Sequence, residues 1–229
     1  MAETPTTEKR WFEFLSLSLL LGLAAAIAAL IFFGWLTDEV LEGDSRHFDE
    51  VTRAAVHQLA SPALTAIMRF LSFVGSSVVL TIGTIIVAIL FIKRTWVREA
   101  KLFAATMIGA AVLNYTLKLT FKRARPTPFF NLTPPETYSF PSGHSLASAC
   151  FFGALAAILT ARIKNRRTRI VVWILSTIMF VSIGLSRIYL GVHHTTDVIA
   201  GFTAAFIWIL MVRFVEVQLA RRAKRNRSS

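Results

Sequence analysis

The chain has 229 residues, 55% of them hydrophobic, and its mean hydropathy of +0.59 is too high for an ordinary soluble domain. Several apolar runs approach the length of about 20 residues that a helix needs to cross a bilayer. The formal net charge is +12, but the cations lie in short clusters between the apolar runs and at the C-terminal tail. This distribution is typical of membrane-protein loops facing anionic lipid, and it argues against a nucleic-acid-binding protein.

The first apolar run, residues 11–36, is too long for the core of a signal peptide, and no clear cleavage site follows it. We therefore expect a retained anchor that forms the first span. The single cysteine, Cys150, lies inside a later apolar run, which excludes an intrachain disulfide and a metal site built on cysteines.

The hydropathy pattern predicts an all-α fold, namely a polytopic membrane protein with six transmembrane helices in one domain covering residues 1–229. The segment between the first two spans is acidic and then amphipathic, so it is expected to form one or two interfacial helices. No internal repeat or low-complexity linker divides the chain. The spans are expected near residues 11–36, 70–92, 100–119, 142–161, 170–189 and 195–214.

The distribution of lysine and arginine predicts the orientation of these spans. With six spans, the cations before the first span, those in two of the connecting loops and those of the tail all fall on one side. This predicts cytoplasmic N- and C-termini in a cell (inner or plasma) membrane, with the acidic first loop outside. The cations concerned are Lys9, Arg10, Lys93, Arg94, Arg98, Lys101, Arg162, Lys164, Arg166, Arg167, Arg169, Arg221, Arg222, Lys224, Arg225 and Arg227.

One basic segment departs from this rule, because Lys118, Lys122, Arg123 and Arg125 fall on the outer side. Charges at membrane depth cost about 2.5–3.5 kcal/mol each and usually have a function. Because successive spans cross the membrane in alternating directions, three sequence stretches are expected at the outer ends of their helices. They are "KLTFKRARP" (118–126), "PSGH" (141–144) and "SRIYLGVHHTTD" (186–197).

These stretches contain the parts of a phosphate site. Arg125 and Arg187 can bind phosphate oxygens in a bidentate manner, and Lys118 adds a point charge. Lys118 and Arg125 share a helix face if the helix extends that far, and Pro126 pushes Arg125 out of helical geometry. Ser142 and Gly143 offer a hydroxyl and free amides at a helix N-terminus, which favours an anion there.

The histidines predict chemistry on the bound phosphate. His193 and Asp197 are four residues apart, so the carboxylate can hold the imidazole. With His144 nearby, one histidine could attack phosphorus while the other protonates the leaving oxygen. Two alternatives are an interfacial turn capped by Thr and Asp and a metal site formed by His144, His193, His194 and Asp197. The nearby cations argue against the metal.

The combined pattern resembles the signature of the type 2 phosphatidic acid phosphatase superfamily, which includes vanadium haloperoxidases and glucose-6-phosphatase. That signature is K-x6-R-P, then P-S-G-H, then S-R-x5-H-x3-D. This chain fills it from Lys118 to Arg125-Pro126, from Pro141 to His144, and with Ser186-Arg187, His193 and Asp197.

The resemblance implies that His193 is a nucleophile forming a phosphohistidine, that His144 is the general acid, and that Asp197 orients His193. It also implies that no metal or other cofactor is required. His194 stands where relatives often carry an aromatic residue, so we expect no catalytic role for it. The residues expected to hold the phosphate oxygens are Lys118, Arg125, Ser142, Gly143 and Arg187.

The expected function is an integral membrane lipid phosphatase with its active site on the extracytoplasmic side. Its substrate would be a lipid phosphate or diphosphate of the phosphatidate, phosphatidylglycerophosphate or undecaprenyl diphosphate class, and its partners the substrate and the bilayer, without nucleic acid. A phosphotransferase using the same intermediate and a non-catalytic lipid-phosphate transporter remain alternatives. We expect four aromatic residues to line or anchor the loop before "PSGH" at the interface: Phe129, Phe130, Tyr138 and Phe140.

Overall fold

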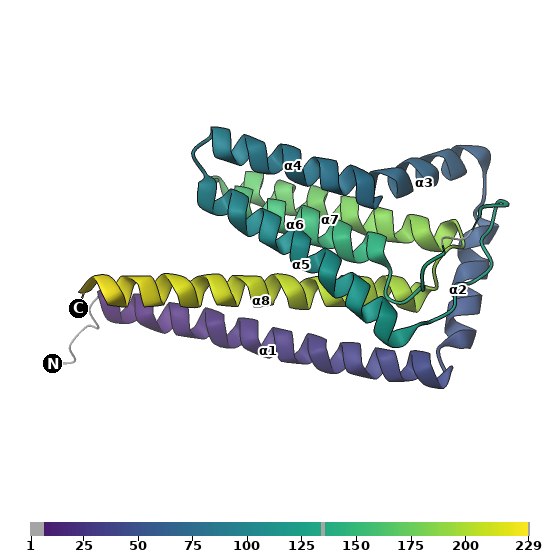
Figure 1. The fold of residues 1–229 in the computed structure, drawn as a ribbon, viewed down its shortest axis with the longest axis horizontal. Coiled ribbons are helices and arrows are strands. Elements are labelled where there is room, and N and C mark those ends of the chain that lie inside the picture. The colour runs from purple at the N-terminus through teal and green to yellow at the C-terminus, as the bar shows by residue number, and fades with distance from the viewer. Residues whose placement is uncertain (1–6, 134–135, 229) are drawn as a thin grey trace.

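The computed structural model describes residues 7–133 and 136–228, and the regular secondary structure in these ranges is helical throughout (Figure 1). Five helices are long and apolar enough to cross a membrane, and the bent pair α3–α4 passes the same test as a sixth. The predicted all-α membrane fold is thus confirmed. The helices are α1 (Thr7–Glu42), α2 (Arg46–Gln58), α3 (Pro62–Val74), α4 (Ser77–Lys93), α5 (Val97–Phe121), α6 (Gly143–Thr160), α7 (Arg166–Tyr189) and α8 (Thr195–Ser228).

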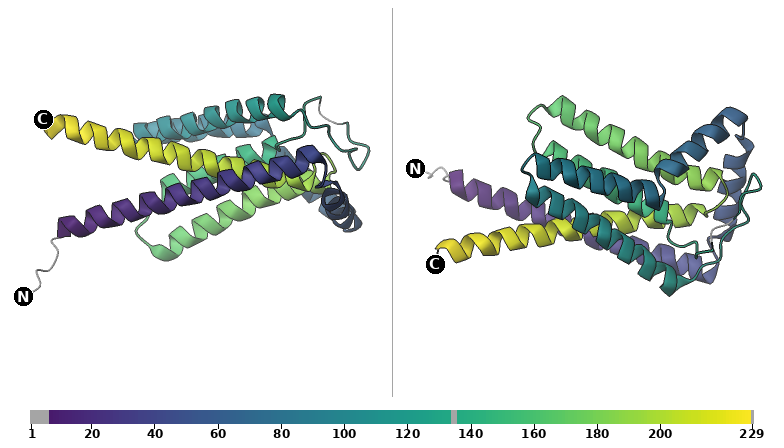
Figure 2. Two further views of the ribbon diagram at one scale, coloured as in Figure 1. Left: turned by 90° about the horizontal axis from the view of Figure 1, so that it is seen from below. Right: turned by 45° about the horizontal axis from the view of Figure 1, so that its top comes forward.

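The long helices run side by side in a bundle, and α2 stands across one end of it (Figures 1 and 2). The loop between α5 and α6 and the turn between α7 and α8 lie at this same end, which we call the α2 end. The loop between α6 and α7, the turn between α4 and α5, and the C-terminus lie at the opposite end. The bundle therefore gathers the three motif-bearing segments at the α2 end.

Helix α6 is the centre of the bundle and packs against α4, α5, α7 and α8. Of its apolar window 56% is buried, against 11–28% in α1, α5, α7 and α8. Small residues such as Ala149, Gly153 and Ala156 allow the neighbouring helices to approach closely. The outer helices instead expose large apolar side chains such as Ile85 and Ile174, as expected for surfaces facing lipid.

The segment expected as a span at residues 70–92 is not one straight helix, because α3 and α4 meet within it at an angle of 53°. The break falls at Gly75, where a Cβ atom would lie 2.3 Å from Ile183 Cγ2 and 3.3 Å from His144 Cδ2. Ser76 then caps α4 by accepting a hydrogen bond from the Val79 N–H. Helix α1 continues to Glu42, into the segment expected to form one or two interfacial helices. The rest of that segment forms α2 and most of α3.

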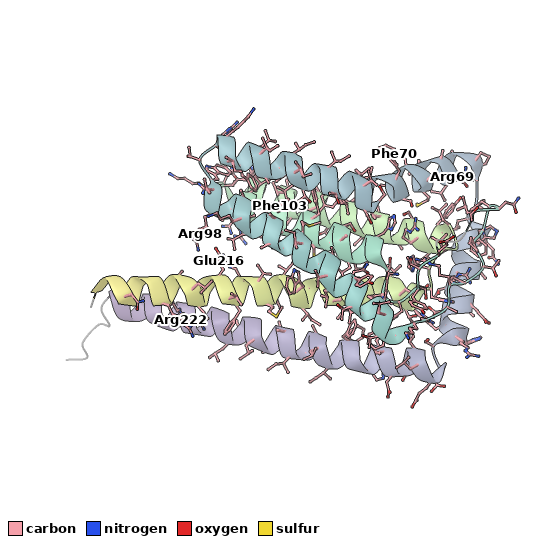
Figure 3. The ribbon with its side chains drawn as sticks, viewed as in Figure 1. Arg69, Phe70, Arg98, Phe103, Glu216 and Arg222 are labelled. Atoms are coloured by element: carbon pink, nitrogen blue, oxygen red, sulfur yellow. The ribbon has the colours of Figure 1, made fainter. Side chains whose placement is uncertain are left out.

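The end of the bundle opposite α2 carries most of the predicted cytoplasmic cations. Arg98 of α5 forms an ion pair of 2.8 Å with Glu216 of α8 (Figure 3), and Arg162 contacts Glu99 at 2.5 Å. Basic side chains outnumber the acidic ones there, and this excess is the pattern on which the predicted orientation rests. The side chains of Lys9, Arg10, Lys224, Arg225 and Arg227 belong to this prediction but lie outside the described residues.

Cysteine labelling tests the orientation. In a Cys150→Ala background we expect Thr133→Cys to react with an impermeant maleimide in intact cells, and Lys164→Cys to react only after permeabilisation, because Lys164 lies in the cation-rich loop. Both side chains are exposed. Asn165 is left unchanged because its side chain caps α7. Labelling of Lys164→Cys in sealed cells without labelling of Thr133→Cys would contradict the orientation.

Candidate active site

Arg125 reaches the site through a loop and not along a helix. Helix α5 ends at Phe121, and Lys122 takes a left-handed conformation (φ 46°) while its N–H bonds to the Lys118 carbonyl. The helix therefore does not extend far enough for Lys118 and Arg125 to share a face, and Arg125 lies outside helical geometry, as expected before Pro126. The Arg125 guanidinium is held by the Thr137 carbonyl at 2.6 Å and by the Val192 carbonyl at 2.9 Å.

Three cations converge at the α2 end. The Lys118 ammonium donates to the Tyr138 carbonyl, and the buried Arg187 donates to the Ser72 hydroxyl, while its Nε has no partner among the described residues. The charges of Arg125 and Arg187 act on one another and on Lys118. Burial lowers the pKa of Arg125, and the nearby Asp197 partly offsets this effect. In the described part of the chain, no carboxylate pairs directly with any of the three, so the cluster is suited to an anion.

The N-terminus of α6 faces this cluster. Ser142 caps the helix, and its Oγ accepts hydrogen bonds from the Ser145 N–H at 3.4 Å and the Ser145 hydroxyl at 2.9 Å. The Ser142 N–H donates to the Asp197 carbonyl at 2.9 Å. Gly143 is the first helical residue, and a Cβ there would lie 3.1 Å from Asn114 Nδ2. Glycine therefore permits the close approach of α5 to a helix end that favours negative charge.

His193 is oriented by its two neighbours. Its Nδ1 lies 3.2 Å from Asp197 Oδ2, and its Nε2 lies 3.1 Å from Arg125 Nη1. An arginine N–H can only donate, so Nε2 must be the acceptor and Nδ1 must carry the proton that bonds to Asp197. The lone pair of Nε2 therefore faces the cation cluster.

The electrostatics favour an uncharged His193. Burial lowers the pKa of its imidazole to about 4, although the hydrogen bond and the charge of Asp197 act in the opposite direction. With a pKa this far below neutrality the ring is uncharged at neutral pH. A neutral imidazole is the form that can attack phosphorus.

His144 lies at the start of α6, close to the cations. Arg187, His193 and Arg125 are near enough for their charges to act on its ring, and it interacts with the Ser72 backbone. The structure thus brings together all eight residues proposed from the sequence: Lys118, Arg125, Ser142, Gly143, His144, Arg187, His193 and Asp197.

Arg123 and Asp49 also lie at the site, through contacts with Asp197 and with one another, and the sequence prediction gives neither of them a role. Arg123 donates to Asp197 Oδ1 at 2.6 Å and to Asp49 Oδ2 at 2.8 Å. Asp49 comes from α2 and is buried. Arg123 stands out in the sequence only as one of four misplaced cations, and Asp49 only as one of several acids in an amphipathic segment.

The aromatic residues of the loop have different surroundings from those expected. Phe140 is fully buried and packs with Phe33 and Phe121, so it does not anchor the loop at the interface. Phe129 stacks on His57 with ring centroids 4.0 Å apart, and Phe130 stacks on Tyr189 at 5.4 Å. Tyr138 is exposed.

A cavity of about 780 Å³ is lined by the α5–α6 loop itself, with Arg123, Arg125 and Tyr138 among its lining residues. Within residues 7–133 and 136–228, no three His, Cys, Asp or Glu side chains are grouped so that they could hold a metal ion. The residues of the alternative metal site, His144, His193, His194 and Asp197, form no such group in these ranges.

A family model described as the PAP2 superfamily matches residues 99–219, more than half of the chain. The chain belongs to the PAP2 superfamily. This match confirms the resemblance drawn from the sequence motifs, and residues 99–219 contain every residue of those motifs, from Lys118 to Asp197.

Relatives extend the similarity of this PAP2 chain beyond the motifs. It is 29% identical to phosphatidylglycerophosphatase B of Bacillus subtilis over 85% of this chain and 96% of that protein. It is 34% identical to an undecaprenyl-diphosphatase of Sulfolobus acidocaldarius over 68% of this chain and 70% of that protein.

A solved structure shares the fold. The crystal structure of a transmembrane PAP2 type phosphatidylglycerolphosphate phosphatase from Bacillus subtilis matches with a TM-score of 0.77 at 28% identity, covering 84% of this chain and 96% of that one. The similarity therefore includes helices that precede the motifs.

Proposed function

We propose that this protein is a membrane lipid phosphatase that removes a terminal phosphate through a phosphohistidine on His193. The observation that carries the proposal is the arrangement of His193, with its protonated Nδ1 on Asp197 and its Nε2 lone pair beside Arg125. Membership of the PAP2 superfamily and relatives named as phosphatases support it.

The first half-reaction transfers the phosphoryl group to the enzyme. Lys118, Arg125, Arg187 and the N-terminus of α6 hold the phosphate oxygens and stabilise the charge that develops on them. The Nε2 lone pair of His193 forms a bond to phosphorus as the bond to the leaving oxygen breaks. His144 gives that oxygen a proton, and Asp197 stabilises the imidazolium.

The second half-reaction reverses the role of His144. It takes a proton from water, whose oxygen attacks the phosphohistidine, and the bond between Nε2 and phosphorus breaks to release inorganic phosphate. If a lipid hydroxyl takes the place of water, the same intermediate serves a phosphotransferase. A non-catalytic transporter would not need a His193–Asp197 pair.

The proposed substrate is a lipid phosphate or diphosphate, because the cation cluster lies at one end of a membrane bundle, where lipid head groups are found. The relatives are named for phosphatidylglycerophosphate and undecaprenyl diphosphate, and phosphatidate belongs to the same chemical class. We place the site on the extracytoplasmic side, because the cation-rich loops lie at the opposite end.

The purified protein should release phosphate from at least one of these three lipids in excess chelator, because cations of the chain occupy the place a metal would take. Vanadate should inhibit it, since vanadate can adopt the five-coordinate geometry of phosphorus in the transition state. The measurement is free phosphate together with phosphorylated acceptor lipid.

Two results would count against these statements. Loss of activity in chelator that magnesium or zinc restores would refute metal independence. Phosphate found only on an acceptor lipid, with none released, would identify a phosphotransferase.

A further inference from the structure

We propose that Asp49 and Arg123 are positioning residues for the nucleophile, which hold Asp197 in the orientation that fixes the His193 imidazole. The role of His193 as the nucleophile rests on the proposed function. Neither Asp49 nor Arg123 occupies a defining position of the three motifs, and Asp49 comes from α2, outside the matched segment of the family.

The Arg123 guanidinium joins two carboxylates. Nη1 donates to Asp197 Oδ1 at 2.6 Å and to the Thr196 hydroxyl at 2.8 Å, and Nη2 donates to Asp49 Oδ2 at 2.8 Å. The carboxylates are 0% and 1% exposed, and the Arg123 side chain is 13% exposed. A planar fork with several donors is needed to make these contacts together, and lysine does not provide one.

Asp49 also fixes the start of α8. Its Oδ1 accepts the Thr196 N–H at 2.9 Å, and its Oδ2 accepts the Thr196 hydroxyl at 2.8 Å. A carboxylate at this place satisfies a free N–H of the first helical turn and interacts favourably with the helix dipole. Asp49 thus acts as a cap for α8 that comes from another helix.

As a result, each carboxylate oxygen of Asp197 has its own hydrogen-bond partners. Oδ1 is bound to Arg123, and Oδ2 accepts from His193 Nδ1 at 3.2 Å and from the His194 N–H at 2.9 Å. The carboxylate cannot rotate without breaking a contact, so the imidazole plane is fixed as well. Asp49 balances part of the Arg123 charge, which would otherwise weaken Asp197 as a partner for the imidazolium.

The same two helices offer a matched control. The Thr52 hydroxyl of α2 and the Thr195 hydroxyl of α8 are 2.6 Å apart, and both side chains are uncharged. Thr52→Ala removes this contact between α2 and α8 and a hydrogen bond to the Asp49 backbone carbonyl, but it removes no contact made by the side chains of Asp49, Arg123 and Asp197. This variant shows whether a loss of activity comes from weaker packing of α2 against α8 or from a changed orientation of Asp197.

Kinetics per active site provide the first test. Asp49→Asn, which is nearly isosteric, and Arg123→Lys should each lower kcat about 10- to 100-fold, as losses of outer partners of active-site groups do. KM should change little, because neither side chain contacts the phosphate. Thr52→Ala should keep wild-type values. The active-site concentration comes from the burst of phosphoenzyme, so that misfolded protein is not counted.

Nitrogen NMR of isotope-labelled histidine provides a test that needs no activity. The wild type should hold His193 as the Nδ1–H tautomer, identified by loss of its signals in His193→Gln, and Asp49→Asn and Arg123→Lys should give a mixture of tautomers. Thr52→Ala should resemble the wild type.

The outcomes separate the two proposals. A wild type that forms no phosphoenzyme from any lipid phosphate refutes the proposed function, while the tautomer comparison still judges the network. Asp49→Asn with a wild-type tautomer and a wild-type kcat per site overturns the positioning role, and so does an equal loss in Thr52→Ala.

Discussion

His193→Ala is expected to lower the rate of phosphate release about 10⁴-fold or more and to abolish the covalent phosphoenzyme. The variant removes the imidazole whose lone pair, at Nε2, faces the cation cluster while Asp197 supports the opposite nitrogen. Losing an activated nucleophile costs several orders of magnitude in enzymes that form covalent intermediates. The measurement is phosphoenzyme after an alkaline detergent quench, because the P–N bond of phosphohistidine is labile in acid, together with free phosphate from a labelled lipid phosphate.

His194→Ala is the matched control. The contact of residue 194 with Asp197 is made by its backbone N–H, which alanine retains, and its ring lies 4.0 Å from Asp49 Oδ2. The variant should stay far more active than His193→Ala. An inactive His194→Ala beside a His193→Ala protein that still traps phosphate would move the nucleophile to residue 194.

His144→Ala is expected to lower phosphate release from a lipid substrate by about 10²- to 10⁴-fold, the usual contribution of a general acid. The alkoxide of a lipid is a poor leaving group and needs a proton, and His144 is the second histidine at the cluster. A nitrophenyl phosphate leaves without that proton. With this ester, His144→Ala should recover much of its rate of phosphoenzyme formation, and His193→Ala should recover none.

The second half-reaction distinguishes this explanation from simple damage to the site. Because His144 also activates the water, the phosphoenzyme of His144→Ala should accumulate and decay slowly after the nitrophenyl ester has reacted. A variant equally impaired on both substrates, with no accumulated phosphoenzyme, would contradict the role of His144 as acid and base.

Much of the fold follows from local sequence. The long apolar runs determine the spans, since a helix that satisfies its own backbone in lipid needs only sufficient length and hydrophobicity. The break between α3 and α4 is not visible in the hydropathy pattern, because apolar residues continue through it. It is located by the contact of Gly75 with Ile183 and His144, which belong to other helices.

The candidate site was predictable to the extent that its residues lie in short motifs. Ser142 caps α6, and the spacing of His193 and Asp197 suits their ion pair, because both relations are local along the chain. The route of Arg125 was not predictable. It depends on the left-handed Lys122 and on carbonyl groups of Thr137 and Val192 that the fold supplies.

The sequence by itself determined the membrane class, the helical fold and the set of candidate site residues, because hydropathy and motif spacing are properties of neighbouring residues. Only the tertiary structure decided how Asp197 is held. Asp49 and Thr196 are separated by 147 positions and share two hydrogen bonds. Such a contact forms only when α2 closes over the end of the bundle, since a buried carboxylate finds its partners through the fold and not through its sequence neighbours.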